Sequence, residues 1–200
     1  MKQAATIELF SYWDALRAGF DRAILDAAPE QVRALLASTF LVEVDDRRAY
    51  PLRVVGGTLT RITANARLGA SFLECWEPGS RDLLESMLRT VHDERVPVVL
   101  GGRTRRGDGT QLAVESLLLP LATNRGGKPR ILGGMAPAGV INRRDPPGAL
   151  EVVSARAIRA PLPPSGFARS RPAPIVTVKQ KGPPIRTPAL HLHVIEGGRS

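Results

Sequence analysis

Two long apolar runs joined by an Asp-Gly turn constrain the fold of this chain more than any other feature. Residues 97–105 and 110–121 each have the length and composition of a strand, and Gly107-Asp108-Gly109 lies between them. Asp-Gly between two such runs is a strong hairpin signal, because both residues tolerate positive φ. The sequence therefore predicts an antiparallel sheet that contains this hairpin.

The second run of the hairpin carries large apolar side chains at both alternations. One face presents Leu112, Val114 and Leu118, and the other presents Leu117, Leu119 and Leu121. A strand that is apolar on both faces has to be covered on both. We therefore expect a further layer on each side of the sheet, with helices from the middle of the chain on one side.

The N-terminal segment is the expected cover for the other face. Leu9, Trp13, Leu16 and Phe20 have the spacing of one side of an amphipathic helix. This helix either covers its own sheet or is exchanged with a second subunit. The same four side chains are the candidate dimer or docking face.

The other predicted elements surround this hairpin. Runs at residues 39–45 and 49–55 predict an antiparallel pair of strands, and residues 58–95 follow a broken helical pattern that ends in one clear helix. The remaining elements are a short helix beginning at Pro29, a strand over residues 130–136 and a strand candidate over residues 150–158.

The composition changes near residue 150. Residues 151–200 hold 8 of the 17 prolines and 8 Lys+Arg against 2 Asp+Glu, whereas residues 1–150 hold 20 Lys+Arg against 17 Asp+Glu. A Pro/Arg/Ser-rich tail with few large apolar residues cannot offset its ordering entropy, so disorder is predicted there. The chain divides into an N-terminal helical cap (1–38), a core (39–137), a closing strand or linker (138–160) and a basic tail (161–200).

Several separate segments resemble one family, in the right order along the chain. They are residues 9–17 (LFSYWDALR), 72–78 (FLECWEP), 95–99 (RVPVV), 117–121 (LLLPL) and 132–134 (LGG). Together they resemble a stand-alone bacterial PAS-like family of alphaproteobacterial type, in which a basic C-terminal tail is common. The resemblance implies an α+β fold: a five-stranded antiparallel sheet, short helices inserted after strand two and an N-terminal amphipathic helix.

The resemblance also implies a non-catalytic sensory or signalling module. Such domains act by sensing a small ligand, by protein–protein interaction or by dimerisation, and they commonly feed motility, polarity or two-component outputs. The expected partner is a second copy of the chain or a signalling protein. The alternative is a nucleic-acid-binding accessory protein that acts through its cationic tail, although Phe167 alone provides no stacking platform there.

Candidate ligand contacts come from the helical region and from the hairpin. Phe72, Trp76 and Met87 are expected to line a ligand pocket if one exists, because side chains of PAS helices point toward the sheet. The other interpretation of these large apolar residues is packed core. Arg103 and Arg105 either contact an anionic ligand or are solvated arginines near the hairpin end.

Cys75 and His92 are the residues that suggest a cofactor. Light-sensing PAS domains place a reactive cysteine in this region, but FLECWEP lacks the Asn-Cys-Arg-Phe-Leu-Gln type of motif, which favours a buried, inert thiol. His92 lies where haem-binding members supply an axial ligand, yet Asp93-Glu94-Arg95 after it is typical of an exposed helix end. Haem and flavin stay as alternatives, and no cofactor is assigned.

The sequence supports neither catalysis nor a metal centre nor membrane insertion. It has no nucleophile elbow, P-loop, HExxH or dinucleotide glycine motif, and Gly101-Gly102 inside a strand pattern predicts a bulge. His191 and His193 do not complete a zinc site, and the single cysteine excludes a cysteine cluster. The chain start lacks a signal-peptide core and no apolar run approaches about 20 residues, so a cytoplasmic location is expected.

Overall fold

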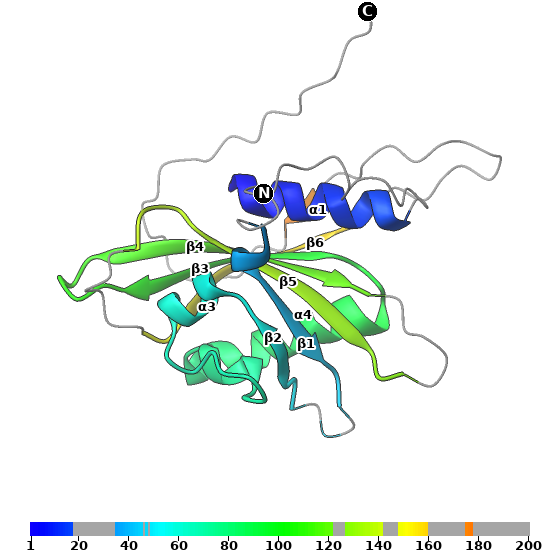
Figure 1. Ribbon diagram of the computed structural model, residues 1–200, viewed down its shortest axis with the longest axis horizontal. Helices are drawn as coiled ribbons and strands as arrows, with labels where there is room; N and C mark the ends of the chain where they lie inside the picture. Colours follow the sequence, from blue (N-terminus) through cyan, green and yellow to red (C-terminus); the bar gives the residue numbers. More distant parts are fainter. Residues whose placement is uncertain are drawn as a thin grey trace, which may run out of the picture.

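A single antiparallel sheet lies between two helical layers in the computed structural model, which describes residues 1–17, 35–45, 47, 49–121, 127–141, 148–159 and 175–177 (Figure 1). The helices are α1 (Ala4–Arg17), α3 (Gly57–Ile62) and α4 (Arg81–Asp93), with the short 3₁₀ helices η1 (Phe72–Cys75) and η2 (Pro78–Ser80). The strands are β1 (Thr39–Glu43), β2 (Leu52–Val55), β3 (Val98–Arg105), β4 (Gln111–Pro120), β5 (Arg130–Pro137), β6 (Glu151–Ile158) and β7 (Ile175–Thr177).

The strands lie in the order β2-β1-β5-β4-β3-β6-β7, and every neighbouring pair is antiparallel. Strands β1 to β5 form the predicted five-stranded arrangement, with α3, η1, η2 and α4 inserted after the second strand. β6 confirms the strand candidate near the end of the domain. Because β6 and β7 add to the free side of β3, the sheet has seven strands where five were predicted.

The β3–β4 hairpin forms where the Asp-Gly turn predicts it. Arg106 N donates to Thr110 O at 2.8 Å, and Gly109 N donates to Arg106 O at 3.0 Å. Within this fully described turn, Gly109 alone has a positive φ, of 83°. The Asp108 carboxylate instead accepts a hydrogen bond from Thr110 N at 2.8 Å. The connection is therefore a three-residue loop that ends in a left-handed glycine.

Each face of the sheet has its own apolar cluster, as the alternation along β4 predicts. The inner face lies under α3, η1 and α4, and its cluster includes Leu112, Val114 and Leu118. The outer face lies under α1, and its buried cluster consists of Leu9, Trp13, Val99, Leu117 and Leu119. In this chain α1 covers its own sheet, which is one of the two arrangements that the sequence allows.

Some predicted elements lie outside the described residues. They include Phe20 of the predicted N-terminal helix, most of the helix predicted from Pro29, and nearly all of the tail. Residues 35–38, at the end of the helix predicted from Pro29, are described and are helical. Within the tail, Ile175–Thr177 pairs with β6, so a strand is found at three residues where disorder was predicted. Three consecutive β-branched residues account for it, because they favour an extended backbone.

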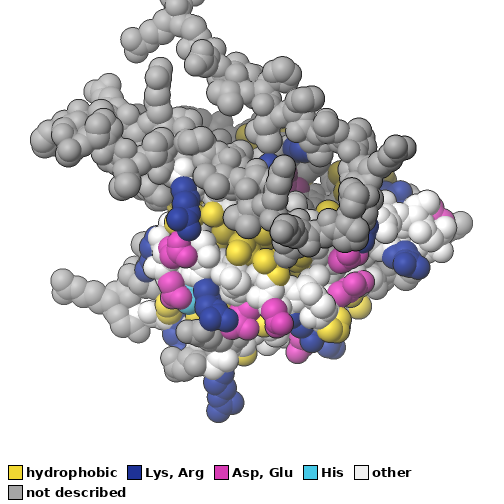
Figure 2. Space-filling view, turned by 180° about the vertical axis from the view of Figure 1, so that it is seen from behind, with side chains coloured by type: hydrophobic (Ala, Val, Ile, Leu, Met, Phe, Trp, Pro, Cys, Tyr) yellow, Lys and Arg dark blue, Asp and Glu magenta, His cyan; other side chains and the backbone are white. Residues whose placement is uncertain are grey.

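Charges of both signs share the described surface. On the face opposite to that of Figure 1, Lys/Arg and Asp/Glu side chains are interspersed (Figure 2). This agrees with the near balance of charge over residues 1–150.

Candidate functional site

The inner face holds the three residues predicted to line a ligand site. Phe72 and Trp76 are fully buried, and Met87 packs against the same cluster from α4. Phe72 stacks on Phe40 with ring centroids 4.8 Å apart and meets the edge of Trp76 at 6.0 Å. These residues are packed as an aromatic core between η1 and the sheet.

Two of the buried polar groups that lack a hydrogen-bond partner in the described part of the chain come from the inner face of the sheet and from the layer that covers it. They are Trp76 Nε1 and Ser116 Oγ, and each residue is 1 % exposed. The Trp76 ring lies over Gly102, where an added Cβ would be 3.1 Å from a ring carbon. Gly102 pairs with Val114, and Ser116 is the next inner-facing position on β4, about 7 Å further along.

Ser116 was not predicted as a site residue, although the sequence carries a signal for it. Ser116 is a hydroxyl residue inside an otherwise apolar alternation of β4, on the face shared by Leu112, Val114 and Leu118. A buried hydroxyl requires a partner. We call Phe72, Trp76, Met87 and Ser116 together the inner-face site.

Cys75 is buried in the same layer. Its exposed fraction is 0 %, and burial, with a smaller contribution from the Glu74 charge, raises the pKa of the thiol from 9.0 to about 12. The thiolate is the reactive form of cysteine, so the thiol is held inert near neutral pH. This position agrees with the interpretation of Cys75 as an unreactive core residue.

His92 precedes an exposed helix end, as predicted, but its own ring is largely buried. It lies in the last turn of α4, but its side chain is only 8 % exposed. The ring packs beside Tyr50 at a centroid distance of 6.3 Å, and Nδ1 lies 2.6 Å from Asp93 Oδ1. The exposed helix end predicted from Asp93-Glu94-Arg95 is confirmed, because all three residues are exposed, whereas the His92 ring just before them is largely buried.

On the outer face, α1 turns its predicted apolar side toward the sheet. Leu9 is 2 % and Trp13 is 3 % exposed, and Trp13 Nε1 donates to Pro120 O on β4 at 2.8 Å. The Leu16 side chain and all of Phe20 lie outside the described residues. As far as it is described, the predicted docking face is the internal face of α1, so a partner reaches it only if the helix is exchanged or displaced.

A carboxylate on β4 holds the beginning of α1. Glu115 is 8 % exposed, and it accepts hydrogen bonds from Lys2 N at 2.9 Å, from Gln3 N at 3.2 Å and from the Thr6 hydroxyl. The first N–H groups of a helix have no intrahelical partner, and negative charge is favourable there. Glu115 was not predicted as an anchor, although an acidic residue inside an apolar strand indicates that hydrogen-bond donors lie nearby.

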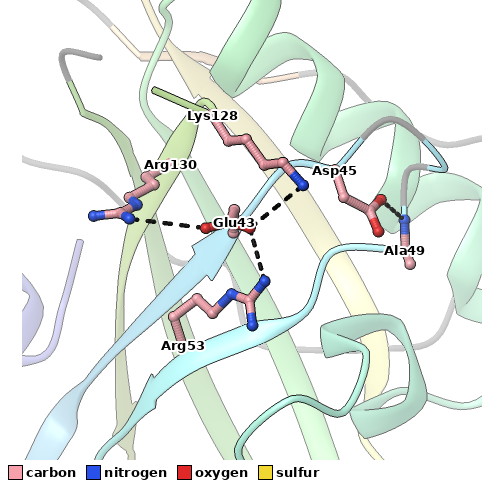
Figure 3. Close-up of polar contacts among 6 residues, drawn as sticks. All are labelled: Glu43, Asp45, Ala49, Arg53, Lys128 and Arg130. Carbon is pink, nitrogen blue, oxygen red and sulfur yellow. Dashed lines mark hydrogen bonds and ion pairs between the residues drawn. The ribbon is translucent and has the colours of Figure 1, made fainter. Parts of the chain in front are cut away.

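The Glu43 carboxylate, at the end of β1, lies close to three cationic side chains (Figure 3). Arg53 Nη2 donates to Glu43 at 2.8 Å, and Arg130 Nη2 and Lys128 Nζ lie 3.8 and 4.0 Å from its carboxylate. The Arg53 hydrogen bond, together with the charges of Arg53, Lys128 and Arg130, holds the pKa of Glu43 below its usual 4.5. The cluster links β1 and β2 to β5 and to Lys128, two residues before β5, with all three cations about half exposed.

Acid titration is expected to reveal this cluster. A carboxyl group whose pKa is lower in the folded state stabilises the fold above its unfolded pKa, and this contribution is lost as the pH falls through the folded value. Glu43→Gln should therefore reduce the loss of unfolding free energy between pH 6 and pH 3. Urea titrations at several pH values measure it, with the exposed Glu8→Gln on α1 as the control. Equal acid dependence in wild type and Glu43→Gln would contradict the assignment.

The two hairpin arginines differ in their surroundings. Arg103 donates to both carboxylate oxygens of Glu151, through Nε at 2.6 Å and Nη2 at 2.7 Å. Arg105 is exposed. Arg103 is therefore occupied by an intramolecular partner on β6, and contact of either arginine with an anionic ligand stays a prediction.

The described residues hold neither a candidate metal centre nor a membrane-spanning helix. No group of three or more His, Cys, Asp or Glu side chains in this part of the chain is placed to hold a metal ion. No helix in the same part is long and apolar enough to cross a membrane.

The strand order β2-β1-β5-β4-β3, with helices inserted after β2 on one face of the sheet, defines a PAS-type α+β domain. A model of the PAS domain family matches residues 1–136, and the chain belongs to this family. Among solved structures, the chain is similar to a variant of RsLOV at 20 % identity and a TM-score of 0.38, over 57 % of this chain and 69 % of that one. No curated protein matches the chain.

Proposed function

We propose that this PAS domain is a non-catalytic sensor of a small molecule bound at the inner-face site. The observation that supports the proposal most directly is the pair of buried, unpartnered groups, Trp76 Nε1 and Ser116 Oγ. Buried polar groups in folded proteins almost always have a hydrogen-bond partner, and each group without one lowers the stability of the fold by about 1–3 kcal/mol. A ligand that bonds both groups would remove this cost.

The chemistry of the inner-face site limits the class of ligand. An indole N–H only donates, so the ligand needs an acceptor for Trp76, while Ser116 accepts or donates. The surrounding side chains are apolar and aromatic, which favours a compact, largely apolar molecule with one or two polar atoms. An ordered water is the competing occupant, because a water also satisfies a donor and a hydroxyl.

The proposed output is a protein contact made through α1. This helix rests on the outer face of the strands whose inner face carries Ser116, and Glu115 and Pro120 of β4 hold it at two points. A change in β4 therefore reaches α1 directly. The receiver is a signalling protein or a second copy of the chain.

Mass spectrometry of the purified full-length chain tests the proposal. We expect native spectra to show a bound small molecule, and Trp76→Phe to reduce its occupancy at least 10-fold because the ring is kept and the N–H donor is lost. Trp13→Phe, the same change on the outer face, is the matched control. The proposal would be contradicted if native spectra show only the mass of the protein and if extracts of small metabolites do not raise its melting temperature. Water would then be the occupant of the site.

A further inference from the structure

Residues 148–159 extend the domain past the end of the PAS family match at residue 136. We call this segment the C-terminal strap. It is part of the domain core, because Leu150 is 0 % exposed and belongs to the inner-face cluster. The basic tail begins where the strap ends.

The first half of the strap is bonded to the helical layer. Leu150 N donates to Cys75 O at 3.0 Å, and Glu77 N donates to Leu150 O at 2.7 Å. Val152 N donates to Ser80 Oγ at 2.9 Å. These bonds attach residues 150–152 to the end of η1 and to η2, immediately around Trp76.

From Glu151 onward the strap is also a strand of the sheet. β6 pairs with β3 from Glu151↔Arg103 to Ala157↔Val98, and Ile158 N donates to Pro97 O at 2.7 Å. The register shifts between Gly101 and Gly102, which confirms the bulge predicted at these glycines. One continuous segment therefore spans the helical layer and the edge of β3.

Trp76 lies beside the part of the strap that contacts both the helical layer and β3. Its backbone forms a parallel bridge with Leu150, and its ring lies against Gly102 at the bulge. A Cβ at Gly102 would be 3.1 Å from the Trp76 ring and 3.3 Å from Glu151 O. Any shift of the Trp76 ring therefore acts on the strap through Leu150 and through Gly102.

We propose that the C-terminal strap transmits changes at the inner-face site to the basic tail, because residues 150–152 are bonded to the η1–η2 region and residues 151–157 are paired with β3. The strap and the helical layer then open and close together. The input rests on the proposed ligand function, but the coupling itself exists in the protein without ligand. Absence of a ligand and absence of coupling are therefore separate results.

Cys75 provides a direct measurement of this coupling. It is the single cysteine of the chain, it is buried, and its carbonyl accepts the Leu150 bond, so its rate of labelling by a thiol reagent reports opening of η1. Ala155→Pro disturbs β6 in the middle of its pairing with β3, at a residue paired with Leu100. We expect Cys75 labelling to rise about 10-fold or more, with hydrogen exchange increasing in β3 and β6.

Val153→Ala is the matched control, because Val153 is 57 % exposed on the same strand and the change leaves the backbone intact. The reverse experiment is Ser80→Ala, which removes the acceptor of Val152 N and should increase hydrogen exchange at residues 156–158. The Ser80→Ala variant tests the coupling by itself if Ala155→Pro fails to fold. Faster exchange in β6 with unchanged Cys75 labelling, or no effect of Ser80→Ala beyond Val152, would overturn the proposal.

Discussion

Gly56→Ala is expected to lower the free energy of unfolding by about 3 kcal/mol, the upper part of the range for an overpacked site. A Cβ at this position would lie 2.4 Å from Thr39 O, 2.5 Å from Ala37 O and 2.8 Å from Leu36 O. All three atoms belong to the backbone, so no side-chain rotation relieves the contact. Gly56 N also donates to Thr39 O at 2.8 Å, which holds the segment in place.

The neighbouring glycine is the control for this prediction. Gly57 is the first residue of α3, and an added Cβ there meets nothing within 4 Å. Gly57→Ala should be neutral or should raise stability by about 0.4–1 kcal/mol, because alanine restricts the unfolded chain. Urea unfolding of both variants measures the difference. Equal stabilities for Gly56→Ala and Gly57→Ala would show that the carbonyls move away.

The arrangement of the sheet was predictable because its signals are local. The Asp-Gly turn predicts the β3–β4 pair, and the double alternation of β4 predicts a cover on both faces. Leu117 and Leu119 lie under α1, as the sequence implies, while Leu112 and Leu118 lie in the inner cluster. The alternation of side chains along a strand predicts which face of the sheet each residue lies on, and both faces of β4 are apolar.

The partners of β6 and β7 were not predictable in the same way. The composition of residues 150–158 predicts a strand, but nothing local in it says that the strand joins the free side of β3. β-pairing depends on which edge is available, and this is a property of the whole fold. For that reason the predicted sheet had five strands, whereas the observed sheet has seven.

The polar anchors were missed because hydrogen-bond partners lie far apart in sequence. Glu115 meets Lys2 across 113 residues, and Ser80 meets Val152 across 72. A sequence shows that a buried acid or hydroxyl needs a partner, but the partner follows only from the packing. The burial of the His92 ring was missed in the same way, because Tyr50, which packs beside it, comes from another part of the chain.

Trp13→Ala is expected to lower the unfolding free energy by about 3–5 kcal/mol, the usual cost of truncating a buried large aromatic side chain. Trp13 is 3 % exposed, and its indole donates to Pro120 O, so the change removes both packing and a hydrogen bond. Tyr12→Ala, a half-buried aromatic residue one position earlier on the same helix, should cost far less. Urea unfolding of the two variants gives the comparison.

The same variant tests how α1 shields the outer face. With Trp13 removed, Glu115 still holds the first turn of the helix, but nothing at position 13 covers Leu117 and Leu119 on β4. Exposed apolar area of this kind promotes association. We expect Trp13→Ala to increase in mass with concentration in light scattering, while Tyr12→Ala behaves as wild type. If Trp13→Ala keeps both the mass and the stability of wild type, then α1 is not the element that closes this face.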